Sequence, residues 1–282
     1  MDEQVPGIKE SIKPLVSVIM SVFNGEQFLQ KAIESILSQT YSNWEFIILD
    51  DASNEATQRI LNPFKADSRF KIIRHEVNRG LTKNLNYAIE LSRGEFIARM
   101  DADDISLPTR FEEQVNFLRK HTHTVAVFGT VELIDEEGDS NGFWEDDIKA
   151  ITYQKIKSRL PFSNCVAHPT VMIRKDILQQ YMYNEEQVHS QDWDLWLRMV
   201  SDGRIIEKIN NTVLLYRIHK NSVTNISNKK SAFLKMHNSY KPYLKNVWEE
   251  KKLSTFNLLV YVGFFLNSIK LGLSRIKRFF LK

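Results

Sequence analysis

Apolar side chains in the first hundred residues form two alternating patterns. Four short, mostly apolar stretches occur at residues 15–23, 44–50, 70–75 and 95–100. The first two are continuous, which is typical of strands that are covered on both faces. Between the stretches, apolar side chains recur every three or four residues, at 26–37, 55–61 and 81–91. This spacing gives a helix one apolar face, so the chain predicts a β-α-β-α-β-α-β unit.

Such alternation predicts a parallel, doubly wound α/β sheet. Ligands of these sheets bind at the carboxyl ends of the strands. Three polar segments follow predicted strands, namely FNGE (23–26), LDDASN (49–54) and MDADD (100–104). We therefore expect these segments to meet at one edge of the sheet.

The second half is less regular but continues the same mixed pattern up to about residue 225. We expect strands at 124–135 and 212–219, a strand entering a helix at 168–176, and a helix at 191–203. Another helix should start near Pro108, with Asp104 or Ser106 as its cap, because proline is favoured in a first turn.

The segment 99–104, RMDADD, places Asp101, Asp103 and Asp104 within four positions. A solvated loop or a helix cap accounts for one or two of these carboxylates but poorly for three. An EF-hand is excluded because Ser106 replaces the glycine that its loop requires. Mg²⁺ or Mn²⁺ is often held by one or two carboxylates together with substrate phosphates. The cluster therefore predicts a divalent metal site that also touches a phosphate.

Two other candidates stay open on the pattern alone. Asp192 starts the helix at 191–203, where a side chain can reach a cleft, or it is only a helix-start charge. For Asp194 we favour a surface or helix-start acid. His219 ends a predicted strand and is either structural or part of a site. The chain lacks a dinucleotide fingerprint, a P-loop and zinc-ligand spacing.

Composition narrows the class of protein. The 282 residues carry a net charge of +3, with 43% apolar residues, as in an ordinary globular protein. The last 32 residues hold seven Lys or Arg and no acid, which leaves 31 basic and 35 acidic side chains, a net charge of −4, on the rest. A nucleic-acid binder would carry its basic patch on the folded body. The single Cys165 and a polar N-terminus without a signal peptide indicate a cytoplasmic protein.

Five ordered blocks resemble family 2 glycosyltransferases, which are inverting, nucleotide-sugar-dependent enzymes with the GT-A fold. The match runs from about residue 15 to 224. The blocks are VSVIMSVFNGEQFLQKAIESILSQTYSNWEFIILDDAS, NRGLTKNLNYAIELSRGEFIARMDADD, HPTVMIRKD, QDWDLWLRM and YRIHKNSVT. The resemblance implies a GT-A fold with a mixed, mainly parallel central sheet flanked by helices, and a helical C-terminal tail.

The resemblance also implies roles for residues. Nucleotide-sugar contacts would come from Phe23, Asp50, Asp51, Arg79, Lys83 and Asp101, with Asp51 meeting the base. Metal contacts would come from Asp101, Asp103 and His219. Asp192 would be the catalytic base. The family usually has Glu before this base and this chain has Gln191, a departure that leaves the base in place but could alter acceptor contacts.

The implied activity is transfer of a sugar from a nucleotide-diphosphate donor to an acceptor hydroxyl, with Mg²⁺ or Mn²⁺ as cofactor. The acceptor would be a glycan or lipid-linked glycan of cell-surface polysaccharide synthesis. The alternative is an inactive nucleotide-sugar-binding protein or subunit of a glycan-assembly complex. We expect a leader at 1–14, a catalytic domain at 15–225 and a helical region at 226–282.

The C-terminal stretch is apolar over 256–269 and basic over 270–282. Its apolar run is shorter than the roughly 20 residues that span a bilayer. It is either a pair of helices packed on protein or an interfacial anchor. By analogy with relatives that act on lipid-linked intermediates, we favour peripheral contact with the inner face of the cell membrane. We then expect truncation after Glu250 to spare catalysis on a soluble acceptor.

Overall fold

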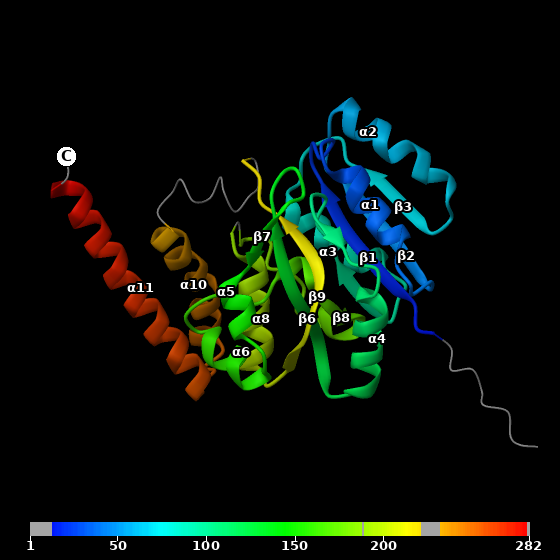
Figure 1. Ribbon diagram of the computed structural model, residues 1–282. Helices are drawn as coiled ribbons and strands as arrows, with labels where there is room; N and C mark the ends of the chain where they lie inside the picture. The colour runs from blue at the N-terminus through cyan, green and yellow to red at the C-terminus, as the bar shows by residue number, and fades with distance from the viewer. Residues whose placement is uncertain (1–12, 188, 221–231, 281–282) are drawn as a thin grey trace, which may run out of the picture.

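The computed structural model describes residues 13–187, 189–220 and 232–280. The expected leader, apart from residues 13 and 14, and residues 221–224 of the last block lie outside the described residues. One nine-stranded sheet forms the centre of this part of the chain, in the order β3-β2-β1-β4-β8-β6-β9-β5, with β7 paired to β6 (Figure 1). Its first four strands are β1 (Val16–Val22), β2 (Trp44–Asp50), β3 (Phe70–Arg74) and β4 (Phe96–Arg99).

These four strands confirm the predicted parallel unit. β1 pairs in parallel with both β2 and β4, and β2 pairs in parallel with β3. The connecting helices are α1 (Leu29–Leu37), α2 (Glu55–Leu61), followed by the 3₁₀ turn η1 (Asn62–Ala66), and α3 (Leu81–Leu91). Parallel pairing brings the carboxyl ends of β1, β2 and β4 to one edge, as expected.

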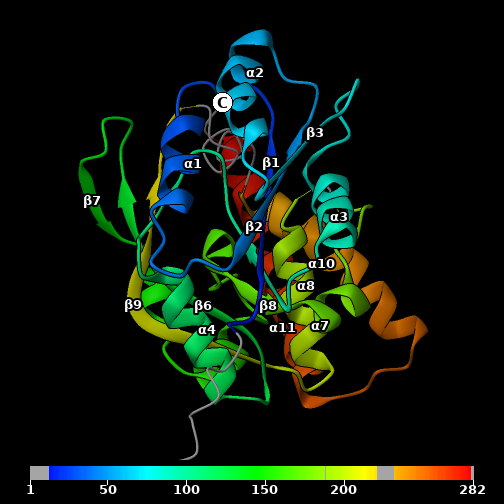
Figure 2. The ribbon, with the colours of Figure 1, turned by 90° about the vertical axis from the view of Figure 1, so that its right-hand side faces the viewer.

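Helices cover both faces of the sheet. In Figure 2, α1 and α4 (Arg110–Lys120) lie to the left of β1 and β2, and α3 lies to their right with α7 (Lys175–Tyr181) and α8 (Gln191–Ser201). Side chains of β1 alternate between two cores: Val18 and Met20 join one with α1 and α4, and Ile19 joins the other with α3 and α8. The sheet is therefore doubly wound, which explains the uninterrupted apolar runs.

The second half adds a mixed set of strands. They are β5 (Ile105–Ser106), β6 (Thr124–Ile134), β7 (Ser140–Phe143), β8 (Met172–Arg174) and β9 (Ile205–Arg217). β8 is antiparallel to β4 and β6, whereas β6 and β9 are parallel. The short elements between β7 and β8 are α5 (Glu145–Lys149), α6 (Tyr153–Arg159) and the 3₁₀ turn η2 (His168–Thr170).

Some predictions for this half were wrong in detail. The helix after Pro108 begins at Arg110, with Thr109 at its cap position. Asp104 instead accepts a hydrogen bond from the Arg217 amide, and Ser106 pairs with β9. Asp194 lies in the first turn of α8, as one of the two expected alternatives stated, but it is not a surface acid. Its carboxylate is buried and accepts a hydrogen bond from Arg198 Nε at 2.8 Å. This ion pair offsets the cost of burying the charge.

The C-terminal region is a helical hairpin of α10 (Ala232–Glu249) and α11 (Thr255–Phe280). It packs beside α8, on the side of the molecule away from α1 and α2 (Figure 1). Tyr240, Tyr243, Phe256 and Val260 are buried in the same core as the tryptophans of α8. The tail therefore packs on its own protein along one face, which was one of the two alternatives left open.

The opposite face of α11 is apolar and exposed. Leu258, Phe265 and Leu273 expose 64%, 65% and 61% of their surface. Residues Thr255–Ser274 are long and apolar enough to cross a membrane by length and composition, which the shorter run at 256–269 did not suggest. One third of that stretch is buried within the protein. A helix that is apolar all round has a buried face and a second face suited to another apolar surface.

Candidate active site

The end of β2 carries two buried carboxylates whose oxygens are held by backbone amides. Asp51 accepts hydrogen bonds from the amides of Arg79 and Gly80, at 2.7 and 2.9 Å. Gly80 has φ = 86°, a left-handed conformation that suits glycine, and it directly precedes α3. Asp50 accepts from the Ser53 amide at 2.9 Å and lies 3.4 Å from Arg74 Nε. The segments after β2 and before α3 are thereby joined at the carboxyl edge.

The other predicted nucleotide contacts surround this pair. Phe23 directly follows β1 and exposes 55% of its surface, so its ring is available for stacking. Arg79 is exposed beside Asp51, and Lys83 is exposed in the first turn of α3. These side chains offer an aromatic face and positive charge to an anionic, ring-containing ligand.

Next along the edge, β4 delivers the carboxylate cluster. Ligand atoms of Asp101, Asp103 and Asp104 all lie within 4.8 Å of one another, the one such acidic or metal-ligating group in the described part of the chain. Arg99, only 5% exposed at the end of β4, forms an ion pair with Asp101. Asp103 Oδ2 lies 3.0 Å from His219 Nε2. The structure thus brings His219 to the cluster.

A second buried arginine shapes the loop from behind. Arg217, at the end of β9, donates its amide to Asp104 Oδ1 at 2.9 Å and its Nε to the Asp103 carbonyl at 3.0 Å. Asp104 is buried, and its Oδ2 has no hydrogen-bond partner among the described residues. Burial and the neighbouring Asp103 raise the pKa of Asp104 well above its usual range. Asp104 therefore anchors the loop more than it faces solvent.

The cluster fits a divalent cation. Burial raises the pKa of Asp101 to about 6, against the lowering effect of Arg99 and with a further rise from Asp103. The charges of Asp103 and Asp192 also raise this pKa, so negative charge gathers around Asp101 even with Arg99 beside it. Half-buried Asp101 and Asp103, with the unpartnered oxygen of Asp104 behind them, offer the hard oxygen ligands that Mg²⁺ and Mn²⁺ take.

Asp192 approaches the same edge from α8. It lies half-buried in the first turn, and Asn164 Nδ2 donates to its Oδ2 at 2.6 Å. Ser190, two residues earlier, adopts a left-handed conformation with φ = 56°, a strain that is often found at functional sites. Burial raises the pKa of Asp192, while the Asn164 bond and the charge of Arg99 lower it.

Asp192 and Asp101 also influence each other electrostatically: the charge of Asp192 is one of the causes that raise the pKa of Asp101. Carboxylates at the end of β4 and the start of α8, about ninety residues apart in sequence, therefore interact electrostatically. The arrangement pairs a potential proton acceptor with a charged cluster that can hold a metal-bound diphosphate.

Sequence reasoning missed three residues of this site. Arg99 precedes the acidic loop in RMDADD, and its charge within an otherwise apolar predicted strand could have indicated a buried partner for one of the aspartates. Arg217 had the same signal in TVLLYRIH. Asn164 had none, because its contact joins an irregular segment to a helix 28 residues further along the chain.

Comparisons with known proteins agree with this geometry. The family model described as "Glycosyl transferase family 2" matches residues 17–182 of this chain. An uncharacterised glycosyltransferase of Methanocaldococcus jannaschii is 33% identical over 92% of this chain and 88% of its own length. The O-antigen biosynthesis glycosyltransferase WbnJ of Escherichia coli is 35% identical over 75% of this chain and 82% of its own.

Solved structures share the fold. S. aureus TarS 1-349 superimposes with a TM-score of 0.68 at 17% identity, over 90% of this chain and 72% of that one. The mannosyltransferase PcManGT of Pyrobaculum calidifontis gives 0.65 at 15% identity, over 91% and 70%. The expected GT-A fold is confirmed. With its ordered motifs and its carboxylates at one sheet edge, the chain belongs to glycosyl transferase family 2.

Proposed function

We propose that this protein transfers a sugar from a nucleotide-diphosphate donor to an acceptor hydroxyl, with inversion. The observation that carries the proposal is the meeting of Asp192 with the Asp101–Asp103 cluster at the edge where Phe23 and Asp51 also lie. Similar proteins fit this chemistry. WfgD of Escherichia coli, 29% identical over 93% of this chain and 94% of its own length, is named a UDP-Glc:alpha-D-GlcNAc-diphosphoundecaprenol beta-1,3-glucosyltransferase. TarS has been solved with UDP-GlcNAc and PcManGT with GDP-Man and Mn²⁺.

In this proposal the chain's own residues divide the work. Phe23 stacks on the base, and Asp51 accepts a hydrogen bond from it in addition to its two backbone amides. Arg79 and Lys83 neutralise part of the phosphate charge. Asp192 removes the proton of the acceptor hydroxyl as that oxygen attacks the anomeric carbon from the face opposite the diphosphate. A Mg²⁺ or Mn²⁺ ion bound by Asp101, Asp103 and His219 would offset negative charge on the leaving diphosphate.

A donor screen tests the activity. The protein is incubated with UDP-, GDP- and dTDP-sugars and Mn²⁺ or Mg²⁺, first by thermal shift and then by release of nucleoside diphosphate. A donor should raise the melting temperature, because a ligand that binds the native state stabilises it. NMR of the glycoside should show an anomeric configuration opposite to that of the donor. Tight binding without turnover on any donor or acceptor would favour a binding protein, and a retained configuration would overturn inversion.

We also propose that the exposed face of α11 lies on an anionic bilayer, where a lipid-linked acceptor would be presented. This face is apolar, and the sequence from residue 270 adds five basic side chains and no acid. In Figure 1 the C-terminal end of α11, at the far left, and the carboxyl ends of β1 and β2, at the right, both point toward the top of the view. Each Lys or Arg near such a surface contributes about 1 kcal/mol of binding.

Flotation with liposomes tests this contact. Replacing Leu258, Phe265 and Leu273 by serine should abolish binding to phosphatidylglycerol vesicles and leave the fold intact, since these side chains are exposed. Val77→Ser removes an equally exposed side chain, 69% accessible, from the loop before α3 and serves as the control. Wild-type protein that stays with the soluble fraction would refute the membrane contact.

A further inference from the structure

The C-terminal hairpin reaches the proposed base through one short segment. Residues 160–164 follow α6 in the irregular stretch before η2, and Asn164 at their end donates to Asp192 at 2.6 Å. Asn164 Oδ1 also accepts the Val166 amide at 3.2 Å, which fixes the side chain in one orientation. The position of this segment therefore determines where the Asp192 carboxylate points.

Three elements hold the segment by its carbonyl groups. Trp193, next to Asp192, donates its indole N–H to the Leu160 carbonyl at 2.9 Å. Tyr240 of α10 donates its hydroxyl to the Pro161 carbonyl at 2.9 Å. The rings of Trp193 and Tyr240 meet edge to face with centroids 4.7 Å apart. Thus α8 and α10 both donate hydrogen bonds to residues 160–161.

The third element is α11, which approaches the same carbonyl at Gly263. A Cβ atom at this position would lie 2.1 Å from the Pro161 oxygen and 2.7 Å from the Tyr240 hydroxyl. Real side chains do not tolerate such distances, so only glycine allows α11 to lie this close. Gly272, two and a half turns further along the same helix, has nothing within 4 Å of its added Cβ.

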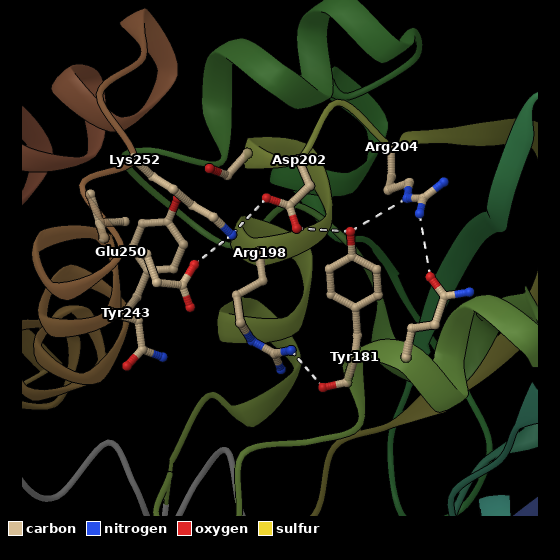
Figure 3. A pocket seen from close by; sticks show the side chains of 11 residues that line it. Tyr181, Arg198, Asp202, Arg204, Tyr243, Glu250 and Lys252 are labelled. Carbon is tan, nitrogen blue, oxygen red and sulfur yellow. Dashed lines mark hydrogen bonds and ion pairs between the residues drawn. The ribbon is translucent and has the colours of Figure 1, made fainter.

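The turn of the hairpin is fixed separately at the far end of α8 (Figure 3). Lys252 bridges Asp202 and Glu250, and Tyr181 donates to Asp202 at 3.0 Å. Asn257 accepts from the hydroxyls of Tyr243 and Ser201. The hairpin is therefore attached at both ends of α8, and α11 cannot shift as a free tail.

We propose that the C-terminal hairpin positions the catalytic base: Tyr240 and Gly263 hold the Pro161 carbonyl, and through that segment Asn164 orients the Asp192 carboxylate. This inference rests on the proposed role of Asp192. It also reverses the expectation drawn from the sequence, because truncation after Glu250 removes Gly263 and should therefore lower kcat. Asn164 engages Oδ2 of that carboxylate at 2.6 Å. A carboxylate held in one rotamer meets the hydroxyl in the reactive geometry more often, and a misplacement of about 1 Å can cost roughly 10²-fold in rate.

The matched test is Gly263→Ala against Gly272→Ala. Both changes add one methyl group to α11 and raise helix propensity equally. Gly263→Ala should lower kcat about 10-fold or more by displacing the segment, while the donor KM and the nucleotide-induced thermal shift stay unchanged. Gly272→Ala should behave like wild type. Hydrogen exchange should show faster amide exchange over 160–166 in Gly263→Ala alone.

Milder variants keep the test valid if Gly263→Ala fails to fold. Tyr240→Phe removes only the hydroxyl, and Asn164→Ala removes only the contact with the carboxylate. Each should lower kcat without changing the donor KM. Equal kcat values for the wild type and all three variants would overturn the positioning role while leaving the proposed function intact. A wild-type protein without turnover would overturn the proposed function itself, and with it the catalytic role of Asp192 that this inference assumes.

Discussion

The donor side and the acceptor side of the proposed site are supported in different ways. On the donor side, Asp51 and Asp101 lie within two residues of their strands, and their partners are backbone amides or the adjacent Arg99. On the acceptor side, Asp192 depends on Asn164, whose own position depends on side chains of α8 and α10 and on the close approach of α11 at Gly263. The donor side is built from local structure and the acceptor side from long-range packing. Distant mutations should therefore disturb acceptor chemistry before donor binding.

The largest effect should come from Asp192→Asn. The amide keeps the shape but cannot take a proton, so kcat should fall by about 10²–10⁴ while donor affinity stays near wild type. Asp176→Asn, the same change at an exposed acid of α7, is the control. Steady-state kinetics and nucleotide-induced thermal shifts separate the two quantities. A collapse of donor affinity at constant kcat would place Asp192 on the donor side instead.

Asp103→Ala should come next and test the donor side. It removes a metal-ligand candidate that is half-buried and outside both cores, so the protein should stay folded while metal-dependent activity falls at least 10²-fold. Asp139→Ala, at an exposed position before β7, should change nothing. Full activity in EDTA, or wild-type rates from Asp103→Ala, would show that no metal is held there.

Asp51→Ala should have a smaller effect that is confined to donor binding. Without the Asp51 carboxylate, the amides of Arg79 and Gly80 lose their hydrogen-bond acceptor, and the proposed contact with the nucleobase is lost too. The donor KM should therefore rise about 10-fold with kcat little changed. Kinetics at saturating acceptor measure both constants. A large fall in kcat would mean that the two halves of the site are coupled more tightly than their separate supports indicate.

The smallest effect concerns pH. Burial raises the pKa of Asp192. A base works only when ionised, so kcat should fall on the acid side at a pH above the ordinary carboxyl range. Arg99, Asp101 and Tyr183 interact electrostatically with Asp192. Asn164→Ala removes a contact that lowers this pKa, so its acid limb should move to higher pH. An acid limb that moves to lower pH would contradict the assignment.

The same contrast explains how much the sequence could predict. The strand ends at Asp50 and Arg99 were predictable because period and composition specify β1–β4, and parallel topology then brings their ends together. The pattern alone left Asp192 and His219 open, and the family resemblance assigned a role to each. Neither approach indicated Gly263 or Tyr240. Helical spacing explains an apolar face but not which neighbour comes close enough to require glycine, since that is decided by packing between distant segments.

Arg99 has a consequence for how ligands would assemble at the donor edge. Its guanidinium, buried beneath Asp101, already cancels part of the charge that would attract a free cation. A divalent ion alone therefore gains less there than it would at three uncompensated carboxylates, and a diphosphate alone meets their repulsion. Each ligand relieves the other's penalty, so their binding free energies are linked, and by reciprocity each raises the other's affinity by the same factor. Metal and nucleotide sugar should load as a cooperative pair.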